Sequence, residues 1–229
     1  MGSWLFIKTQ VPSSGRAIMG DGDMKTLLMG TTNPAKLSQM RDVFSLFGVT
    51  VEGVKDKTLL PYVEEDGLSV EQNARKKACA YARFFDRPVL SVDNGLFFDG
   101  LPDEQQPGIY VRRIGGKEAV TDEELRLHGI ELVRSLGDRA GAYWLYGVCV
   151  STSDGRTAET VVKTPRIFVS EPSTQKIPGY PLESIQIDPE SGKYISEMSE
   201  NEKTTFWQRT IGTPIESFVR RVLNEGLLD

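Results

Sequence analysis

Strand-like and helix-like hydrophobic patterns alternate through the first half of the chain. Apolar runs at 26–29, 49–54 and 89–92 predict strands, and the last is almost entirely apolar, as in strands buried on both faces of a sheet. Between them, two segments repeat apolar residues every three or four positions, which is typical of amphipathic helices. These positions are Leu37, Met40, Val43, Phe44 and Phe47 in the first segment and Val70, Ala74, Ala78, Tyr81, Ala82 and Phe85 in the second. A capping box of Ser69 and Gln72 is predicted to open the second helix.

The second half of the chain is richer in strands. Residues 142–151 and 157–169 are rich in β-formers and are separated by a Ser-Asp-Gly turn, so they predict a long hairpin. A helix is predicted before the hairpin, opened by a capping box of Thr121 and Glu124. A last helix is predicted near the C-terminus, with Thr213 as its cap.

These patterns predict a mixed α/β fold. We expect an elongated mixed sheet with flanking helices and two lobes, one of them smaller and richer in strands, with a cleft between them. Residues 25–229 are expected to form one two-lobed domain, and a chain of 229 residues with 39% hydrophobic content can bury a substantial core. Residues 1–24 are rich in turn formers, which predicts an N-terminal extension that is partly disordered or an artefact of the start site.

Composition narrows the range of partners and compartments. A formal net charge of −5 and a single histidine argue against a nucleic acid polymer as partner, although a nucleotide-sized anion could still bind locally. Cys79 and Cys149 lack CxxC spacing, so free thiols in a reducing compartment are expected. No apolar run reaches transmembrane length, and the N-terminus lacks a signal-peptide pattern. We therefore expect a cytoplasmic protein without a membrane partner.

The segment between the first strand and the first helix has the features of a phosphate site. Asn33 is a favoured N-cap residue, and Pro34 lies where a helix accepts proline best. The backbone N–H groups and dipole of such a helix start favour an anion, as do the hydroxyls of Thr31 and Thr32 and the ammonium group of Lys36. The alternative is an ordinary strand-to-helix turn that binds nothing.

The remaining candidate chemistry lies in carboxylates. The chain has no GxxxxGK[ST] loop, GxGxxG motif or HExxH motif, and His128 lies among charged residues of a predicted helix, where we expect it to face solvent. Glu64 and Glu65 in a predicted loop, with Asp93 at the predicted end of the strand at 89–92, could hold Mg²⁺. The alternative is that the acidic loop is simply solvated.

The order of these motifs resembles the inosine triphosphate pyrophosphatase family, which hydrolyses non-standard purine nucleoside triphosphates. The similarity spans about residues 25–226. The matching segments include counterparts of the family's T-x-N-x-x-K and D-D-S-G-L patterns. They are TTNPAK at 31–36, EEDG at 64–67, QNA at 72–74, VDNGL at 92–96, PGIYVRR at 107–113, PGYP at 178–181, EMSENEK at 197–203 and WQR at 207–209.

This resemblance implies a homodimer with a nucleotide in the cleft. The triphosphate would lie at Asn33 and Lys36, and Mg²⁺ would be held by Asp93 and a glutamate of the Glu64/Glu65 pair. Asp93 would also position or deprotonate the attacking water, and the products would be a nucleoside monophosphate and pyrophosphate. Further substrate contacts are implied for matched positions, with Lys203 and Arg209 on the purine. The others are Thr31, Thr32, Asn94, Gly179, Tyr180 and Gln208.

The chain departs from the family pattern mainly where the base would be read. Val92 replaces the first of two acids, and Gln208 replaces a histidine that contacts the base. Pro178 and Pro181 replace a phenylalanine and an aspartate of the loop that packs on or orients the base. Two hypotheses follow: a Mg²⁺-dependent hydrolase of purine nucleoside triphosphates such as ITP, dITP and XTP, or a non-catalytic nucleotide-binding protein with an altered base site.

Overall fold

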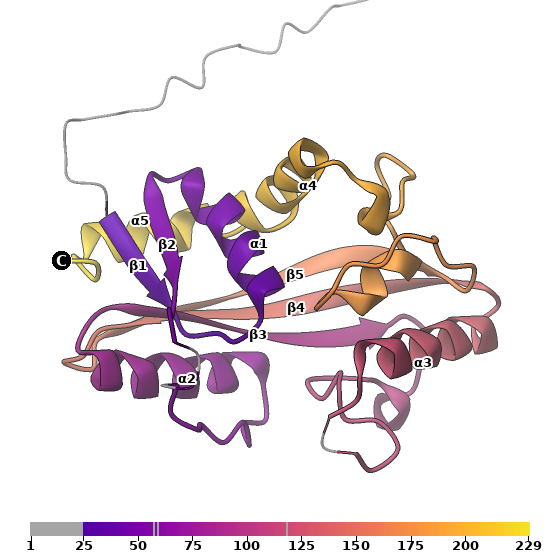
Figure 1. Cartoon of the computed structure of the whole chain (residues 1–229), viewed down its shortest axis with the longest axis horizontal. Coiled ribbons are helices and arrows are strands. Elements are labelled where there is room, and N and C mark those ends of the chain that lie inside the picture. The colour runs from indigo at the N-terminus through magenta and orange to yellow at the C-terminus, as the bar shows by residue number, and fades with distance from the viewer. Residues whose placement is uncertain (1–24, 57, 59, 118) are drawn as a thin grey trace, which may run out of the picture.

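The computed structural model describes residues 25–229 except 57, 59 and 118 (Figure 1). The extension predicted for residues 1–24 lies outside the described residues. In the described part, six strands form one mixed sheet in the order β2-β1-β3-β4-β5-β6. Their bounds are β1 (Lys25–Met29), β2 (Val49–Gly53), β3 (Val89–Phe98), β4 (Arg139–Ser151), β5 (Thr157–Val169) and β6 (Gln186–Ile187). The predicted mixed sheet and its long hairpin, β4 and β5, are confirmed.

Parallel and antiparallel pairings divide the sheet. The strand β1 runs parallel to both β2 and β3, whereas β3, β4, β5 and β6 pair antiparallel in turn. The strand β3 is longer than the predicted run at 89–92, because it continues to Phe98 along β4. Asp93 is therefore in the middle of β3, opposite Gly147 of β4, and not at a strand end as the sequence pattern predicted. The prediction failed because the polar residues Asp93 and Asn94 interrupt the apolar run without interrupting the ladder.

Helices cover both faces of the sheet (Figure 1). They are α1 (Pro34–Ser45), α2 (Val70–Phe85), α3 (Asp122–Ser135), α4 (Glu200–Trp207) and α5 (Glu216–Asn224). Short helical turns are η2 (Asp103–Gln105), η3 (Pro181–Ile185), η4 (Ile195–Glu197) and the π-helical η5 (Gln208–Gly212). The helix α2 lies very close to β4 at Gly147, where a Cβ atom would overlap the backbone of Val70 and Glu71. This close approach brings α2 against the strand position opposite Asp93.

The buried apolar side chains form two main clusters along the sheet. The larger joins α1, α4 and α5 to the strands, around side chains such as Phe44 and Ile211. The second joins α3 and η3 to the far half of β3, β4 and β5, around Phe168 and Ile185. In Figure 1, α2 lies below the left half of the long strands β3, β4 and β5, and α3 lies beside their right end. The elongated sheet thus carries helices at both ends, which leaves space for a site between them.

The helix starts follow the predictions in part. The capping box of Thr121 and Glu124 is present in both directions. At α2, Ser69 caps the N–H of Gln72, but the Gln72 side chain accepts from the N–H of Leu68 and so does not complete the box. The last helix begins at Glu216 without a side-chain cap, so the predicted role of Thr213 is wrong.

Single side-chain predictions can also be compared with the structure. Both cysteines are free within the described ranges, with Cys149 buried and Cys79 partly so. His128 is exposed, as predicted. Across the described residues, no helix combines the length and the apolar character needed to cross a membrane.

Candidate active site

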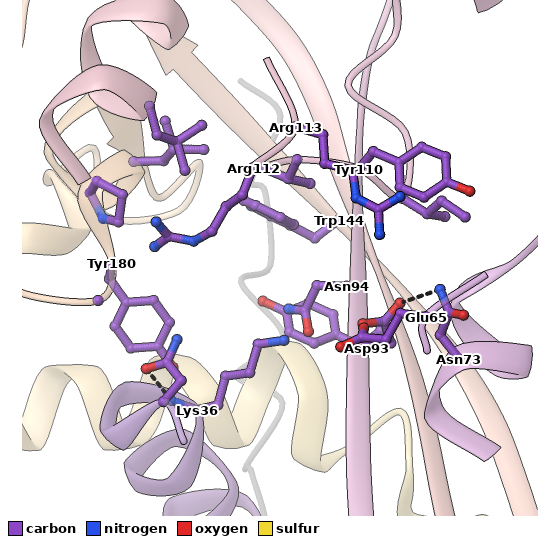
Figure 2. Close-up of a pocket in the computed structure, with 18 of the residues that line it drawn as sticks. Lys36, Glu65, Asn73, Asp93, Asn94, Tyr110, Arg112, Arg113, Trp144 and Tyr180 are labelled. Atoms are coloured by element: carbon purple, nitrogen blue, oxygen red, sulfur yellow. Dashed lines mark hydrogen bonds between the residues drawn. The ribbon is translucent and has the colours of Figure 1, made fainter. Parts of the chain in front are cut away.

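A cavity of about 420 Å³ opens between the start of α1, the middle of β3 and the η3 turn. Its wall includes seven of the predicted site residues: Asn33, Lys36, Glu65, Asp93, Asn94, Gly179 and Tyr180. Figure 2 shows Asp93 and Glu65 on one side and Tyr180 on the other, with Lys36 extending between them. Ligand sites in proteins are commonly cavities of this size with a few convergent polar groups. The structure therefore assembles residues that are up to 147 positions apart in the chain, as from Asn33 to Tyr180.

The start of α1 is capped as predicted. The Asn33 side chain accepts from the N–H groups of Ala35 (2.9 Å) and Lys36 (3.4 Å), and Pro34 lies at the first helical position. The Thr31 hydroxyl accepts from the N–H of Asn33 at 3.1 Å. Neither Thr31 nor Thr32 is among the residues that line the cavity. An anion bound here would therefore meet the ammonium group of Lys36 and the Asn33 side chain first, because Asn33 already occupies two of the helix N–H groups.

Lys77 of α2 connects two of the acidic residues of the cavity, Glu65 and Asp93. Its Nζ lies 2.9 Å from Glu65 and 3.0 Å from Asp93, and its side chain is only 11% exposed. Asn73, one turn earlier, donates to the other Asp93 oxygen at 3.2 Å and accepts from the N–H of Gly67 at 2.8 Å. The sequence prediction missed Lys77. A usable signal was present, because this lysine falls in the apolar stripe of α2 beside Ala74 and Ala78, where an unpaired charge would be costly.

These contacts set the protonation states of the cluster. Burial alone would raise the pKa of the Asp93 carboxyl, but the Lys77 and Lys36 ammonium groups outweigh burial and hold this pKa below its usual value. Burial would lower the pKa of Lys77, yet Asp93 and Glu65 raise it. Burial, followed by repulsion from Lys77, lowers the pKa of Lys36 to about 8. At neutral pH, Asp93 is ionised and both lysines are mainly charged.

A divalent cation is compatible with two of the three predicted ligands. Glu65 and Asp93 face the same ammonium group within 3.0 Å, and magnesium sites commonly use one or two carboxylates with water and phosphate oxygens completing the shell. Glu64 is exposed and does not line the cavity. Among the described residues, no group of three or more His, Cys, Asp or Glu side chains could hold a metal. The donor set thus fits Mg²⁺ through Glu65 and Asp93, with Lys77 as a competitor for both carboxylates.

The opposite wall is aromatic and contains a second buried acid. Tyr180 and Trp207 both line the cavity, with their ring centres 6.3 Å apart. Glu183 of η3 lines it as well, and the Lys203 Nζ lies 3.3 Å from one Glu183 oxygen. Burial raises the pKa of the Glu183 carboxyl to about 7, although Lys203 opposes this shift. Sequence reasoning missed Glu183, because the aligned motif ended at Pro181.

Two of the predicted base contacts point elsewhere. Arg209 pairs with Asp188 at 2.9 Å and with Glu190. The Gln208 side chain donates to the carbonyl of Asp42 at 3.3 Å. Neither residue is part of the cavity wall, and Lys203 reaches it only through Glu183. On the side of the cavity where base contacts were predicted, the wall is therefore formed by η3 and not by Gln208 and Arg209.

A basic segment closes the cavity above Lys36. Arg112 and Arg113 line it, and Figure 2 shows the Arg112 guanidinium directed toward the Tyr180 side. Arg112 donates to Asp122 at 2.8 Å, and Asp122 accepts from the N–H of Gly179 at 2.8 Å. This chain of contacts joins the segment after β3 to the loop before η3. Lys36, Arg112 and Arg113 thus bring three cations to the cavity wall, which can bind the oxygens of a phosphate.

The fold and the site define a mixed α/β protein with a cavity lined by both lysine or arginine and carboxylate side chains. The chain belongs to the Ham1 family, whose model matches residues 27–213. A dITP/XTP pyrophosphatase of Streptococcus agalactiae is 27% identical over 208 residues, which cover 87% of this chain and 63% of that protein. The chain thus spans less than two thirds of the length of this relative.

Solved structures show the same fold. A HAM1 protein from Coxiella burnetii has a TM-score of 0.65 at 20% identity, and the match covers 86% of this chain and all of that one. The Ham1 protein of Staphylococcus aureus has a TM-score of 0.63 at 23% identity, with 86% and 98% covered. The predicted family and fold class are confirmed.

Proposed function

We propose that this protein is a nucleoside triphosphate pyrophosphatase. It would hydrolyse non-canonical purine nucleoside triphosphates such as ITP, dITP and XTP to a nucleoside monophosphate and pyrophosphate, with Mg²⁺. The observation that carries the proposal is that Lys36, Glu65 and Asp93 line one cavity, with Lys77 paired to both carboxylates behind its wall. The printed names of the family relatives, dITP/XTP pyrophosphatases, support it.

Each residue of the cluster has a chemical role in this reaction. Lys36 and Arg112 would bind the phosphate oxygens, because both are cations in the cavity wall. Glu65 and Asp93 would hold Mg²⁺, which would stabilise negative charge on the phosphate that reacts. Asp93 stays ionised at neutral pH and is held on both oxygens by Asn73 and Lys77, so it would fix the orientation of the attacking water. Its lowered pKa makes it a weak base, so orientation is its larger contribution.

The reaction would break one phosphoanhydride bond. The reaction would split the triphosphate between its α- and β-phosphorus. The water oxygen would bond to the phosphorus that is attacked while the bond from that phosphorus to the α–β bridging oxygen breaks. The water protons would leave to solvent or to Asp93. The ammonium group of Lys36, which lines the cavity, would stabilise the charge that develops on the departing pyrophosphate. We also propose that the protein acts as a homodimer, which light scattering of the purified chain would test.

A release assay tests the activity. The protein is incubated with ITP, dITP, XTP and the four standard nucleotides with Mg²⁺, and pyrophosphate is measured. We expect release from ITP, dITP and XTP, loss of release with EDTA, and at least about a hundredfold lower turnover for Asp93→Asn. Asp103→Asn, an exposed aspartate of η2, is the matched control and should keep full activity. Absence of release from every nucleotide would refute the enzyme proposal.

One observation favours the second candidate, a nucleotide-binding protein without turnover. Lys77 Nζ lies within 3.0 Å of both carboxylates that would hold the cation, so it can take the place of Mg²⁺. Thermal stabilisation by nucleotides without pyrophosphate release would select this candidate.

A further inference from the structure

Asp122, the first residue of α3, divides its carboxylate between two parts of the cavity wall. One oxygen accepts from the Arg112 guanidinium at 2.8 Å, and the other accepts from the backbone N–H of Gly179 at 2.8 Å. Arg112 and Gly179 line the cavity, whereas Asp122 lies behind them and does not. Asp122 therefore joins two wall segments that are far apart in the chain.

Arg112 depends on this carboxylate for its direction. An arginine side chain has many rotamers, so its guanidinium takes one position only where other groups hold it. Arg112 donates to the carbonyl of Val120 at 3.3 Å as well as to Asp122, and its side chain is still 38% exposed. Figure 2 shows it extending over the cavity toward Tyr180. A guanidinium has five N–H donors, so one held by two contacts can still donate to a ligand.

Gly179 forms a tight turn at the opposite wall. Its φ is +81°, and a Cβ atom there would lie 3.0 Å from the Asn33 side-chain oxygen, so the turn lies directly against the start of α1. The N–H of Tyr180 closes the turn by donating to the carbonyl of Ile177 at 3.0 Å. The bond from Gly179 to Asp122 thus holds this turn in place, with the Tyr180 side chain in the wall beside it.

The charge of Asp122 suits both contacts. Burial would raise the pKa of its carboxyl, but the N–H of Gly179 and the Arg112 guanidinium hold this pKa below its usual value. The carboxylate is therefore ionised at neutral pH. An ionised acceptor makes stronger hydrogen bonds than a neutral one, with the guanidinium and with the backbone N–H.

We propose that Asp122 is a positioning residue for the nucleotide, which directs Arg112 to the phosphates and holds the Gly179 turn against the nucleoside. The identity of the ligand rests on the proposed function. Asp122 acts only through its two partners, and Asp93 belongs to a different group of contacts. Loss of Asp122 should therefore weaken binding of the ligand much more than it slows the chemical step.

Glu123, the next residue, offers a matched control. It fastens the same loop to α3, because it accepts from the Lys176 Nζ at 2.8 Å, and it also accepts from Arg126. Neither Glu123 nor Lys176 lines the cavity. Glu123→Gln therefore loosens the loop without removing a contact of Arg112 or Gly179. If Asp122 served only to fasten the loop, its variants would behave like Glu123→Gln.

The test measures binding without turnover. IMP and inorganic pyrophosphate, the products proposed for ITP, are titrated into the full chain with Mg²⁺ by calorimetry, and kcat and KM for ITP are measured in parallel. For Asp122→Ala we expect about tenfold weaker binding of both products and about a tenfold higher KM, with kcat changed less than about threefold. Glu123→Gln should leave all four values unchanged.

Two further variants separate the two contacts. Asp122→Asn can still accept from the N–H of Gly179 but has no charge for Arg112, so IMP binding should recover in part while pyrophosphate binding stays weak. In an Arg112→Met background, Asp122→Asn should have almost no further effect on pyrophosphate binding, because its partner is already absent. Thermal melts check folding, and Asp122→Asn carries the comparison if Asp122→Ala does not fold.

The outcomes for this inference and for the proposed function are distinct. Unchanged product binding in Asp122→Ala and Asp122→Asn, or equal effects of Asp122→Ala and Glu123→Gln, would overturn the inference even if pyrophosphate release is observed. Failure of the unaltered protein to bind either product would also overturn it. Weaker product binding in the Asp122 variants of a protein that releases no pyrophosphate would support the inference and refute the proposed function alone.

Discussion

Asp93 and Glu183 are both buried carboxylates in the wall of one cavity, but their surroundings differ. Asp93 receives hydrogen bonds from Asn73 and Lys77, and its pKa is lowered. Glu183 has one cation nearby and no hydrogen bond within the described residues, and its pKa is raised to about 7. Burial is similar, so the difference comes from the neighbours. The charge of Asp93 is balanced by hydrogen-bonded neighbours, whereas that of Glu183 is opposed only by Lys203, 3.3 Å from one of its oxygens.

The largest expected effect comes from removing Lys77. The change Lys77→Met leaves the buried Asp93 charge without its cation, which should lower the free energy of unfolding by about 3–5 kcal/mol and abolish turnover. Urea denaturation measures the loss. Adding Asp93→Asn should restore part of the stability, because the unpaired charge is removed. Lys76→Met is the matched control: Lys76 pairs with Asp66 on the exposed side of α2, and its loss should cost less than about 1 kcal/mol. Equal losses for the two lysines would contradict the role given to Lys77.

The second-largest expected effect is a pH-dependent change in the free energy of unfolding, caused by Glu183. The pKa of Glu183 is about 7 in the folded protein and 4.5 in its ordinary state, so the folded state binds the extra proton between these values. The free energy of unfolding therefore falls as the pH rises through this window. Glu183→Gln removes the titration and should raise the stability at pH 8, relative to its effect at pH 5, by up to about 3 kcal/mol. Thermal melts at both values measure this difference. If Glu183→Gln changes the free energy of unfolding equally at pH 5 and pH 8, ionisation of Glu183 does not destabilise the folded protein.

The smallest effect comes from Gly147, on the strand opposite Asp93. Gly147→Ala would force α2 away from β4, because the added methyl group overlaps the backbone of Val70. We expect a loss of about 2 kcal/mol in the free energy of unfolding, with lower turnover as Asn73 and Lys77 move from Asp93. The pH dependence contributed by Glu183 should stay unchanged, because Glu183 lies in η3. A changed pH dependence in this variant would show that the two sides are coupled.

The fold could be predicted from the sequence where local signals agree with tertiary packing. The helix start at Asn33 and Pro34 and the capping box at Thr121 are short-range patterns, and the structure confirms both. The strand β3 was predicted too short, because its length depends on pairing with β4 and not on its own composition. The cap predicted at Thr213 was wrong for a related reason, since the chain enters α5 from the π-helical turn η5.

The residues of the candidate site also differ in whether local sequence patterns predict them. Asn33, Lys36, Glu65 and Asp93 were predicted and meet in the cavity. Lys77 was not predicted, because nothing in the local sequence shows that a carboxylate from β3 will face it. Glu183 lies in a short turn without periodicity, so only the fold shows that it is buried at the cavity. The site contacts predicted for these residues remain predictions until the binding and release assays are made.

The π-helical turn η5 is a position where the sequence can evolve by insertion or deletion of a residue. A turn of this kind holds one more residue than an α-helical turn, while the helix beyond it keeps its apolar face in phase. Here Ile211 and Ile215 are fully buried on either side of its end. The segment that carries Gln208 and Arg209 is therefore a place where the chain can gain or lose a residue without disturbing the core.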